Sequence, residues 1–165
     1  MPAADASGGQ DPAADRSQEA FERGLAALRR REWGSAELAE WLAARGYEQA
    51  DVNTAIARLT EVGELDDRRF ATRFAEDKRD LQGWGPERIR EALAGRGIPR
   101  ELIDLALGED GHADQLARAS GLLERRAQPV ETDGERGRAL AYLTRRGYDY
   151  DLAYEAVRLH GREAA

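Results

Sequence analysis

The chain contains three copies of one 19-residue segment, and the copies align without a gap. They read LAEWLAARGYEQADVNTAI from Leu38, IREALAGRGIPRELIDLAL from Ile89 and ALAYLTRRGYDYDLAYEAV from Ala139. The Arg-Gly pair in the middle of each copy follows the previous pair after about 50 residues. A fixed period of this size is typical of repeat architectures, in which each repeat is one small supersecondary unit.

The middle of each copy predicts the end of one helix and the start of the next. Glycine reaches the left-handed backbone conformation without a Cβ clash, so it commonly follows the last turn of a helix. The arginine before it suits the negative end of the helix dipole, and the apolar residue after it can fold back on the helix. Gly46, Gly97 and Gly147 therefore predict three tight reversals between helices.

Apolar residues recur at spacings of three and four from Phe21 to Leu159, which indicates amphipathic helices. No segment alternates apolar and polar residues long enough to predict a strand. A further helix precedes each copy, at about 18–31, 66–82 and 113–127. We therefore expect an all-α fold of three tandem three-helix repeats, with helix-turn-helix-like units at 19–65, 66–110 and 111–165. Residues 1–18 lack apolar periodicity, so they are expected to form a disordered tail.

The residue types argue against catalysis. The 165 residues include no cysteine and two histidines, His112 and His160, so a thiolate nucleophile and a Cys- or His-based metal site are not expected. No nucleotide-binding or hydrolase motif is present. Acidic pairs such as Asp66-Asp67 lie on Arg-interleaved helices, where carboxylates usually pair with arginine or face solvent. The sequence therefore predicts a binding protein without a cofactor rather than an enzyme.

The sequence also predicts the compartment. No apolar run approaches the roughly 20 residues that a membrane span requires. The first residues lack the basic and apolar regions of a signal peptide. We therefore expect a monomer in the cytoplasm with no membrane partner.

The charge pattern narrows the class of partner. The chain carries 25 basic and 32 acidic residues, a net charge of −7, and Lys78 is its single lysine. A protein that binds DNA by itself usually shows an excess of basic charge, because phosphate neutralisation dominates such affinity. The basic residues nevertheless form clusters, including Arg125-Arg126 and Arg145-Arg146. This pattern favours a protein partner, with a few arginines reaching nucleic acid beside it.

The repeat and its flanking motifs resemble the RecX family of recombination regulators. The resemblance covers roughly Leu25 to Leu159, nearly the whole part that is predicted to fold. Three motifs carry it by their order and spacing: Ser35-x-x-Leu38-x-x-x-Leu42-x-x-x-Gly46-Tyr47, Gly63-x-Leu65-Asp66-Asp67-x-x-Phe70-Ala71 and Gly83-x-Gly85-x-x-x-Ile89-x-x-x-Leu93-x-x-x-Gly97-Ile98.

The resemblance implies a fold and a function. Members of the family are non-enzymatic proteins of three tandem three-helix repeats, which form an elongated, curved molecule. They bind in the groove of the filament that the RecA recombinase forms on single-stranded DNA. There they suppress strand exchange and ATP hydrolysis during DNA repair and recombination. The family is generally more basic than this chain, so a large direct contact with DNA is not expected here.

We place the expected partner surface on the second repeat, with a smaller patch on the third. Its residues are the basic side chains Arg68, Arg69, Arg73, Lys78, Arg88, Arg90, Arg145 and Arg146. Two alternatives remain open at this point. The helix–reversal–helix blocks could act as helix-turn-helix DNA-binding units, or the chain could be a helical scaffold for an unrelated partner.

Charge reversal at Arg69, Arg73 and Arg88 is expected to weaken filament binding by about tenfold or more, because reversal removes an attraction and adds a repulsion. Co-sedimentation with RecA filaments measures this directly. Unchanged binding by a folded triple variant would show that the partner surface lies elsewhere.

Overall fold

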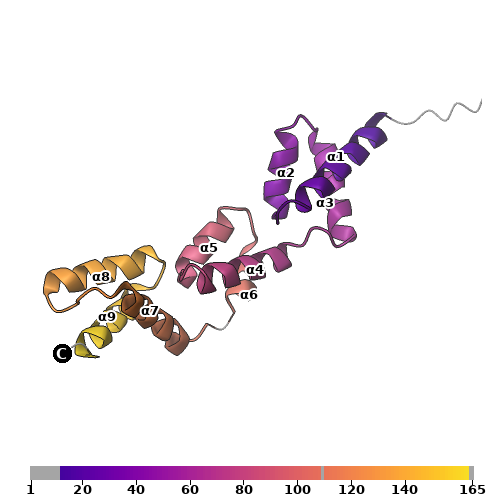
Figure 1. Ribbon diagram of the computed structural model, residues 1–165. Helices are drawn as coiled ribbons and strands as arrows, with labels where there is room; N and C mark the ends of the chain where they lie inside the picture. The colour runs from indigo at the N-terminus through magenta and orange to yellow at the C-terminus, as the bar shows by residue number, and fades with distance from the viewer. Residues whose placement is uncertain (1–11, 109, 164–165) are drawn as a thin grey trace, which may run out of the picture. The chain divides into compact units, whose positions relative to one another are not determined.

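The computed structural model describes residues 12–108 and 110–163, and all regular secondary structure in these ranges is α-helical, which confirms the predicted class. Figure 1 shows the helices in chain order. Their bounds are α1 Pro12–Leu28, α2 Ser35–Ala43, α3 Gln49–Glu61, α4 Asp67–Asp80, α5 Pro86–Ala94, α6 Arg100–Leu107, α7 His112–Arg126, α8 Asp133–Arg145 and α9 Tyr150–Glu163.

The chain divides into two compact units, Met1–Asp67 and Arg68–Ala165. The buried apolar side chains form three clusters. The first unit holds one cluster, between Ala20 and Leu65. The second unit holds two, one within 70–107 and one within 119–157. Each cluster falls inside one of the predicted repeats, and the number of repeats stays a prediction of the sequence.

The three predicted reversals are confirmed. Gly46, Gly97 and Gly147 have φ values of 87°, 75° and 89°. Beyond the last of them, the amide of Tyr148 donates to the carbonyl of Leu143 at 3.2 Å, and the amide of Gly147 donates to that of Thr144 at 2.9 Å. These two bonds define a Schellman closure, which satisfies carbonyls at the end of α8. The buried Tyr148 ring then packs in the cluster of the α7–α9 region.

The first helix begins earlier than the sequence predicts. α1 starts at Pro12, so residues 12–18 are helical and the assignment of this part of 1–18 to a disordered tail is wrong. Residues 1–11 lie outside the described ranges. Polar contacts hold this part of the helix against the rest of the unit: the Ser17 hydroxyl donates a hydrogen bond to Asp51 at 2.6 Å, and Arg16 donates one to the carbonyl of Gly46 at 3.0 Å. Apolar periodicity carries no sign of such contacts.

A main-chain junction joins α5 to α8 within the second unit. The amide of Gly85 donates to the carbonyl of Arg146 at 2.7 Å, and the amide of Glu87 donates to that of Gly147 at 3.1 Å. Free amides at the start of one helix thereby meet free carbonyls at the end of another, which satisfies both sets. The backbones approach so closely that a Cβ on Gly85 would lie 2.4 Å from the carbonyl oxygen of Gly147. We call this contact the α5–α8 junction.

Replacement of Gly85 by alanine tests the junction. Gly85 has φ −79° and ψ 167°, which alanine adopts readily, so the expected harm is the clash alone. Overpacking of this kind typically costs about 1–3 kcal/mol. Thermal and urea denaturation of the Gly85→Ala variant should show such a loss.

Gly111→Ala is the matched control. Gly111 precedes α7 with φ −60° and ψ 153°, and its nearest atom to an added Cβ lies 3.8 Å away. Glycine is modestly favoured over alanine at the residue before a helix, so both substitutions cost the same small amount of stability for this reason. Equal destabilisation of the two proteins would contradict the close approach at Gly85.

Candidate functional site

A basic and aromatic hollow of about 680 Å³ lies in the second unit, between the end of α4, the start of α5, α7 and the end of α8. Four of its lining residues are arginines, and one is acidic. The lining residues are Asp80, Leu81, Gln82, Gly83, Trp84, Arg88, Leu122, Arg125, Arg126, Tyr142 and Arg146. We call this site the arginine hollow.

The α5–α8 junction positions two of these arginines. Arg88 comes one residue after the junction and donates to the carbonyl of Arg145 at 3.3 Å. Its guanidinium lies over the Trp84 ring, 4.1 Å from the ring centroid. From the other side of the junction, Arg146 donates a hydrogen bond to the carbonyl of Gln82. The same contact that joins the helices therefore brings Arg88 and Arg146 to one hollow.

The Tyr142 ring contacts two arginines of the hollow. The guanidinium carbons of Arg126 and Arg146 lie 4.6 Å and 4.9 Å from its centroid. Such cation–π contacts restrain a long side chain and leave its N–H donors available. The guanidinium group is permanently charged and forms paired hydrogen bonds with carboxylates and phosphates. The arginine hollow is thus suited to an anionic group from a partner.

The structure brings only some of the predicted residues together. Arg88 and Arg146 line the arginine hollow, and the exposed Arg145 lies beside it. The remaining residues lie on α4 and α5, and none of them lines the hollow. They are the exposed Arg68, Arg69 and Arg73, and the half-buried Lys78 and Arg90. The grouping of all eight into one partner surface stays a prediction.

Two of the four arginines of the hollow were not assigned to the site from the sequence. Arg125 and Arg126 stand out there as a basic pair, but they lie about 40 residues from Arg88. The end of α7 places them at the hollow. Their position in the last turn of a helix is a sequence signal, although it also fits a plain interaction with the helix dipole.

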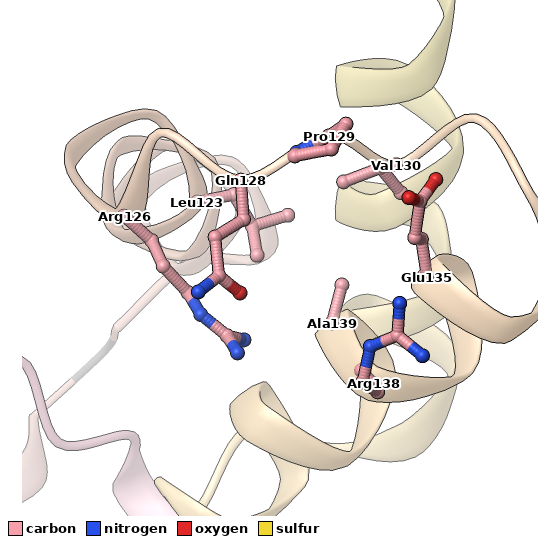
Figure 2. A pocket seen from close by; sticks show the side chains of 8 residues that line it. All are labelled: Leu123, Arg126, Gln128, Pro129, Val130, Glu135, Arg138 and Ala139. Atoms are coloured by element: carbon pink, nitrogen blue, oxygen red, sulfur yellow. The ribbon is translucent and has the colours of Figure 1, made fainter.

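A smaller hollow of about 310 Å³ lies beside the connection from α7 to α8. Figure 2 shows Arg126 and Gln128 on one side of it, and Glu135 and Arg138 on the other. The Glu135 carboxylate accepts hydrogen bonds from the amides of Glu131 and Thr132, which closes a capping box at the start of α8. These bonds hold the pKa of Glu135 below its usual range. Glu135 therefore stabilises the first turn of α8 and is already engaged by main-chain amides.

Arg90 differs from the arginines of the hollow because carboxylates surround it. Its guanidinium donates a hydrogen bond to Asp104 of α6 and lies 4.0 Å from Glu87. The hydrogen bond from Arg90, aided by its charge and that of Arg100, holds the pKa of Asp104 below its usual range. This pairing links α5 to α6.

The Asp104 pair has a measurable signature. Arg90→Ala should raise the pKa of Asp104 towards its ordinary value in an NMR titration, and Arg100→Ala should raise it less. A lowered carboxyl pKa contributes stability above the unfolded-state pKa, and this contribution disappears as the pH falls through the folded-state pKa. Asp104→Asn should therefore lower the melting temperature at pH 7 but not at strongly acidic pH. An unchanged Asp104 pKa in Arg90→Ala would contradict the pairing.

Within the described residues, no helix is both long and apolar enough to cross a membrane. In the same ranges, no group of three or more His, Asp and Glu side chains is placed to hold a metal ion.

Comparisons with known proteins identify the family. Residues 66–107 match the family model described as RecX, second three-helix domain. The chain is 39% identical over 126 residues to the regulatory protein RecX of Pseudomonas fluorescens, which covers 76% of this chain and 81% of that protein. It is 34% identical over 145 residues to the regulatory protein RecX of a Thermus thermophilus strain, which covers 88% of this chain and 94% of that protein.

Solved structures agree on the fold. A crystal structure of RecX from Lactobacillus salivarius superposes with a TM-score of 0.78 at 16% identity, and covers 89% of this chain and 97% of that one. A crystal structure of a regulatory protein RecX gives a TM-score of 0.75 at 22% identity, and covers 88% of this chain and 73% of that one. On the strength of the sequence relatives, which align over most of its length, the chain belongs to the RecX family of regulatory proteins.

Proposed function

We propose that this protein regulates the RecA recombinase by binding in the groove of the RecA filament on single-stranded DNA, where it suppresses strand exchange and ATP hydrolysis. Membership of the RecX family carries this proposal, because its relatives are named regulatory proteins. The arginine hollow supplies the chemistry, since its guanidinium groups suit the carboxylates and phosphates that a DNA-bound filament offers.

Local charge, rather than total charge, governs this binding. The protein carries a net charge of −7, which opposes a large direct contact with phosphates. The arginine hollow nevertheless gathers four arginines against one carboxylate, Asp80. We therefore propose that contact is made chiefly with the protein coat, and that the hollow binds an anionic group within it.

The proposed partner surface has two parts. The first is the arginine hollow with its neighbour Arg145. The second is the set of basic residues on α4, namely Arg68, Arg69, Arg73 and Lys78. Arg90 is left out of this surface, because Asp104 and Glu87 engage its guanidinium. Two separate basic surfaces suit a repetitive partner, since several weak contacts reinforce one another when they form together.

Helix-turn-helix binding to duplex DNA through α6 has less support. In the second unit, α6 follows the reversal at Gly97 and would take the place of a recognition helix. Its first residue, Arg100, lies 3.6 Å from Asp104, and Glu101 and Asp104 add negative charge to the same short helix. A duplex groove would repel these carboxylates.

A RecA ATPase assay on single-stranded DNA tests the proposal. Substoichiometric amounts of the protein should inhibit hydrolysis. The double variant Arg88→Glu, Arg125→Glu should raise the concentration for half inhibition by about tenfold or more, because both side chains are exposed and line the arginine hollow. Strand exchange should recover in parallel.

Arg29→Glu with Arg30→Glu is the matched control, because these two exposed arginines lie in the first unit and outside both proposed surfaces. The control should inhibit like the parent protein, and thermal denaturation should show that both variants are folded. If the parent protein neither inhibits hydrolysis nor sediments with filaments, the proposed function is wrong. If both double variants lose inhibition equally, the assignment to the hollow is wrong.

A further inference from the structure

A second groove, of about 450 Å³, lies between α8 and α9 and shares no lining residue with the arginine hollow. Three of its lining residues are arginines, two are tyrosines and one is acidic. The full set is Asp133, Arg136, Gly137, Leu140, Tyr150, Tyr154, Val157, Arg158, Gly161 and Arg162. We call it the tyrosine groove.

One face of α9 forms the aromatic and basic wall of this groove. Tyr150, Tyr154, Arg158 and Arg162 follow one another at intervals of four residues, so they form a row along the helix. The tyrosines are exposed, at 60% and 56%, and are among the few large apolar side chains that face solvent. Two apolar side chains four residues apart add only a little stability to a helix, whereas binding proteins commonly expose aromatic side chains.

The carboxylates of α9 lie on a different face. Asp151 and Glu155 are also four residues apart, one position along from the tyrosines. Glu155 contacts His112 of α7 at 2.8 Å and is not among the residues that line the groove. The acidic residue of the groove, Asp133, pairs with Arg136 at 3.0 Å. The groove therefore has a net positive lining in a protein of net negative charge.

Glycines and apolar side chains complete the lining of the groove. Leu140 and the buried Val157 lie between the basic and aromatic residues, together with Gly137 and Gly161. An added Cβ at Gly137 would meet no atom within 4 Å, so the space above this residue is open, whereas one at Gly161 would lie 3.2 Å from the carbonyl oxygen of Val130. The groove therefore offers some apolar surface beside its tyrosines and arginines.

We propose that the tyrosine groove binds single-stranded nucleic acid, with bases stacked on Tyr150 and Tyr154 and phosphates at Arg158 and Arg162. Aromatic side chains beside a positively charged groove are the common means of binding single strands, because every base has a ring face and every linkage a negative charge. An acidic peptide would satisfy the arginines but would leave the two tyrosine rings exposed. The proposal does not depend on the proposed function, since it requires no recombinase.

Fluorescence anisotropy of a labelled oligothymidine of about 20 nucleotides, longer than one such groove would cover, measures this binding with the full chain. At low salt the parent protein should bind. The double variant Tyr150→Ala, Tyr154→Ala should bind about tenfold or more weakly, because each base–ring stack contributes substantially to affinity. The variant Tyr150→Phe, Tyr154→Phe keeps the rings and should bind within about twofold of the parent protein.

Two further variants separate stacking from charge. Arg158→Glu with Arg162→Glu should weaken binding and reduce the slope of log affinity against log salt by about 1.4, which is about 0.7 for each lost phosphate contact on a single strand. Leu105→Ala removes an exposed apolar side chain of similar exposure (58%) on α6 and should leave binding unchanged. Photo-crosslinking with a halogenated uridine, followed by mass spectrometry, should label Tyr150 or Tyr154.

The outcomes separate the two proposals. Equal oligonucleotide binding by the parent protein and the Tyr-to-Ala variant, or no binding by the parent protein, would overturn the inference. So would stronger binding of poly-glutamate than of oligothymidine at the groove, which would make it a site for acidic protein segments. If the Tyr-to-Ala variant loses oligonucleotide binding while the RecA ATPase is still inhibited, the groove is confirmed and the proposed function is unaffected. A parent protein that binds oligothymidine but never inhibits RecA would defeat the proposed function alone.

Discussion

The second unit depends on a joint between main-chain groups, the α5–α8 junction. The amides of Gly85 and Glu87 and the carbonyls of Arg146 and Gly147 are groups that a helix end leaves without a partner inside the helix. Hydrogen bonds between the two helix ends supply these partners, so the groups are not left unpaired where they are buried. Two apolar clusters, one on each side, are thereby held within a single compact unit. The junction also sets the position of Arg88 relative to Arg146, on which the arginine hollow depends.

The arginine hollow and the tyrosine groove present their arginines in different ways. In the arginine hollow, Tyr142 and Trp84 hold guanidinium groups over their rings, which reduces the entropy lost when an anion binds. In the tyrosine groove the aromatic rings stay exposed and become part of the binding surface themselves. The first arrangement suits recognition of a charged group, and the second suits recognition of a flat one.

Local sequence patterns predicted the local structure well. The glycines at 46, 97 and 147 marked the reversals, because the left-handed backbone leaves a clear residue signature. The site was predicted less well, since Arg125 and Arg126 meet Arg88 only through the packing of α7 against the rest of the unit. Arg90 illustrates the same point from the other side, because nothing in a one-dimensional pattern shows that its guanidinium is paired with Asp104. Sequence spacing reports which residues share a helix face, but it does not report which faces meet.

The early start of α1 changes where the folded part of the chain can be cut. Asp51 is buried to 7% exposure, and the hydroxyl of Ser17 lies 2.6 Å from its carboxylate, with Arg16 at 3.9 Å. A shortened protein that begins at residue 18 would look reasonable from hydrophobicity alone. It would leave a buried carboxylate without either partner, which is among the more damaging changes that a small helical core can suffer. A minimal first unit must therefore retain two polar residues that contribute nothing to its apolar core.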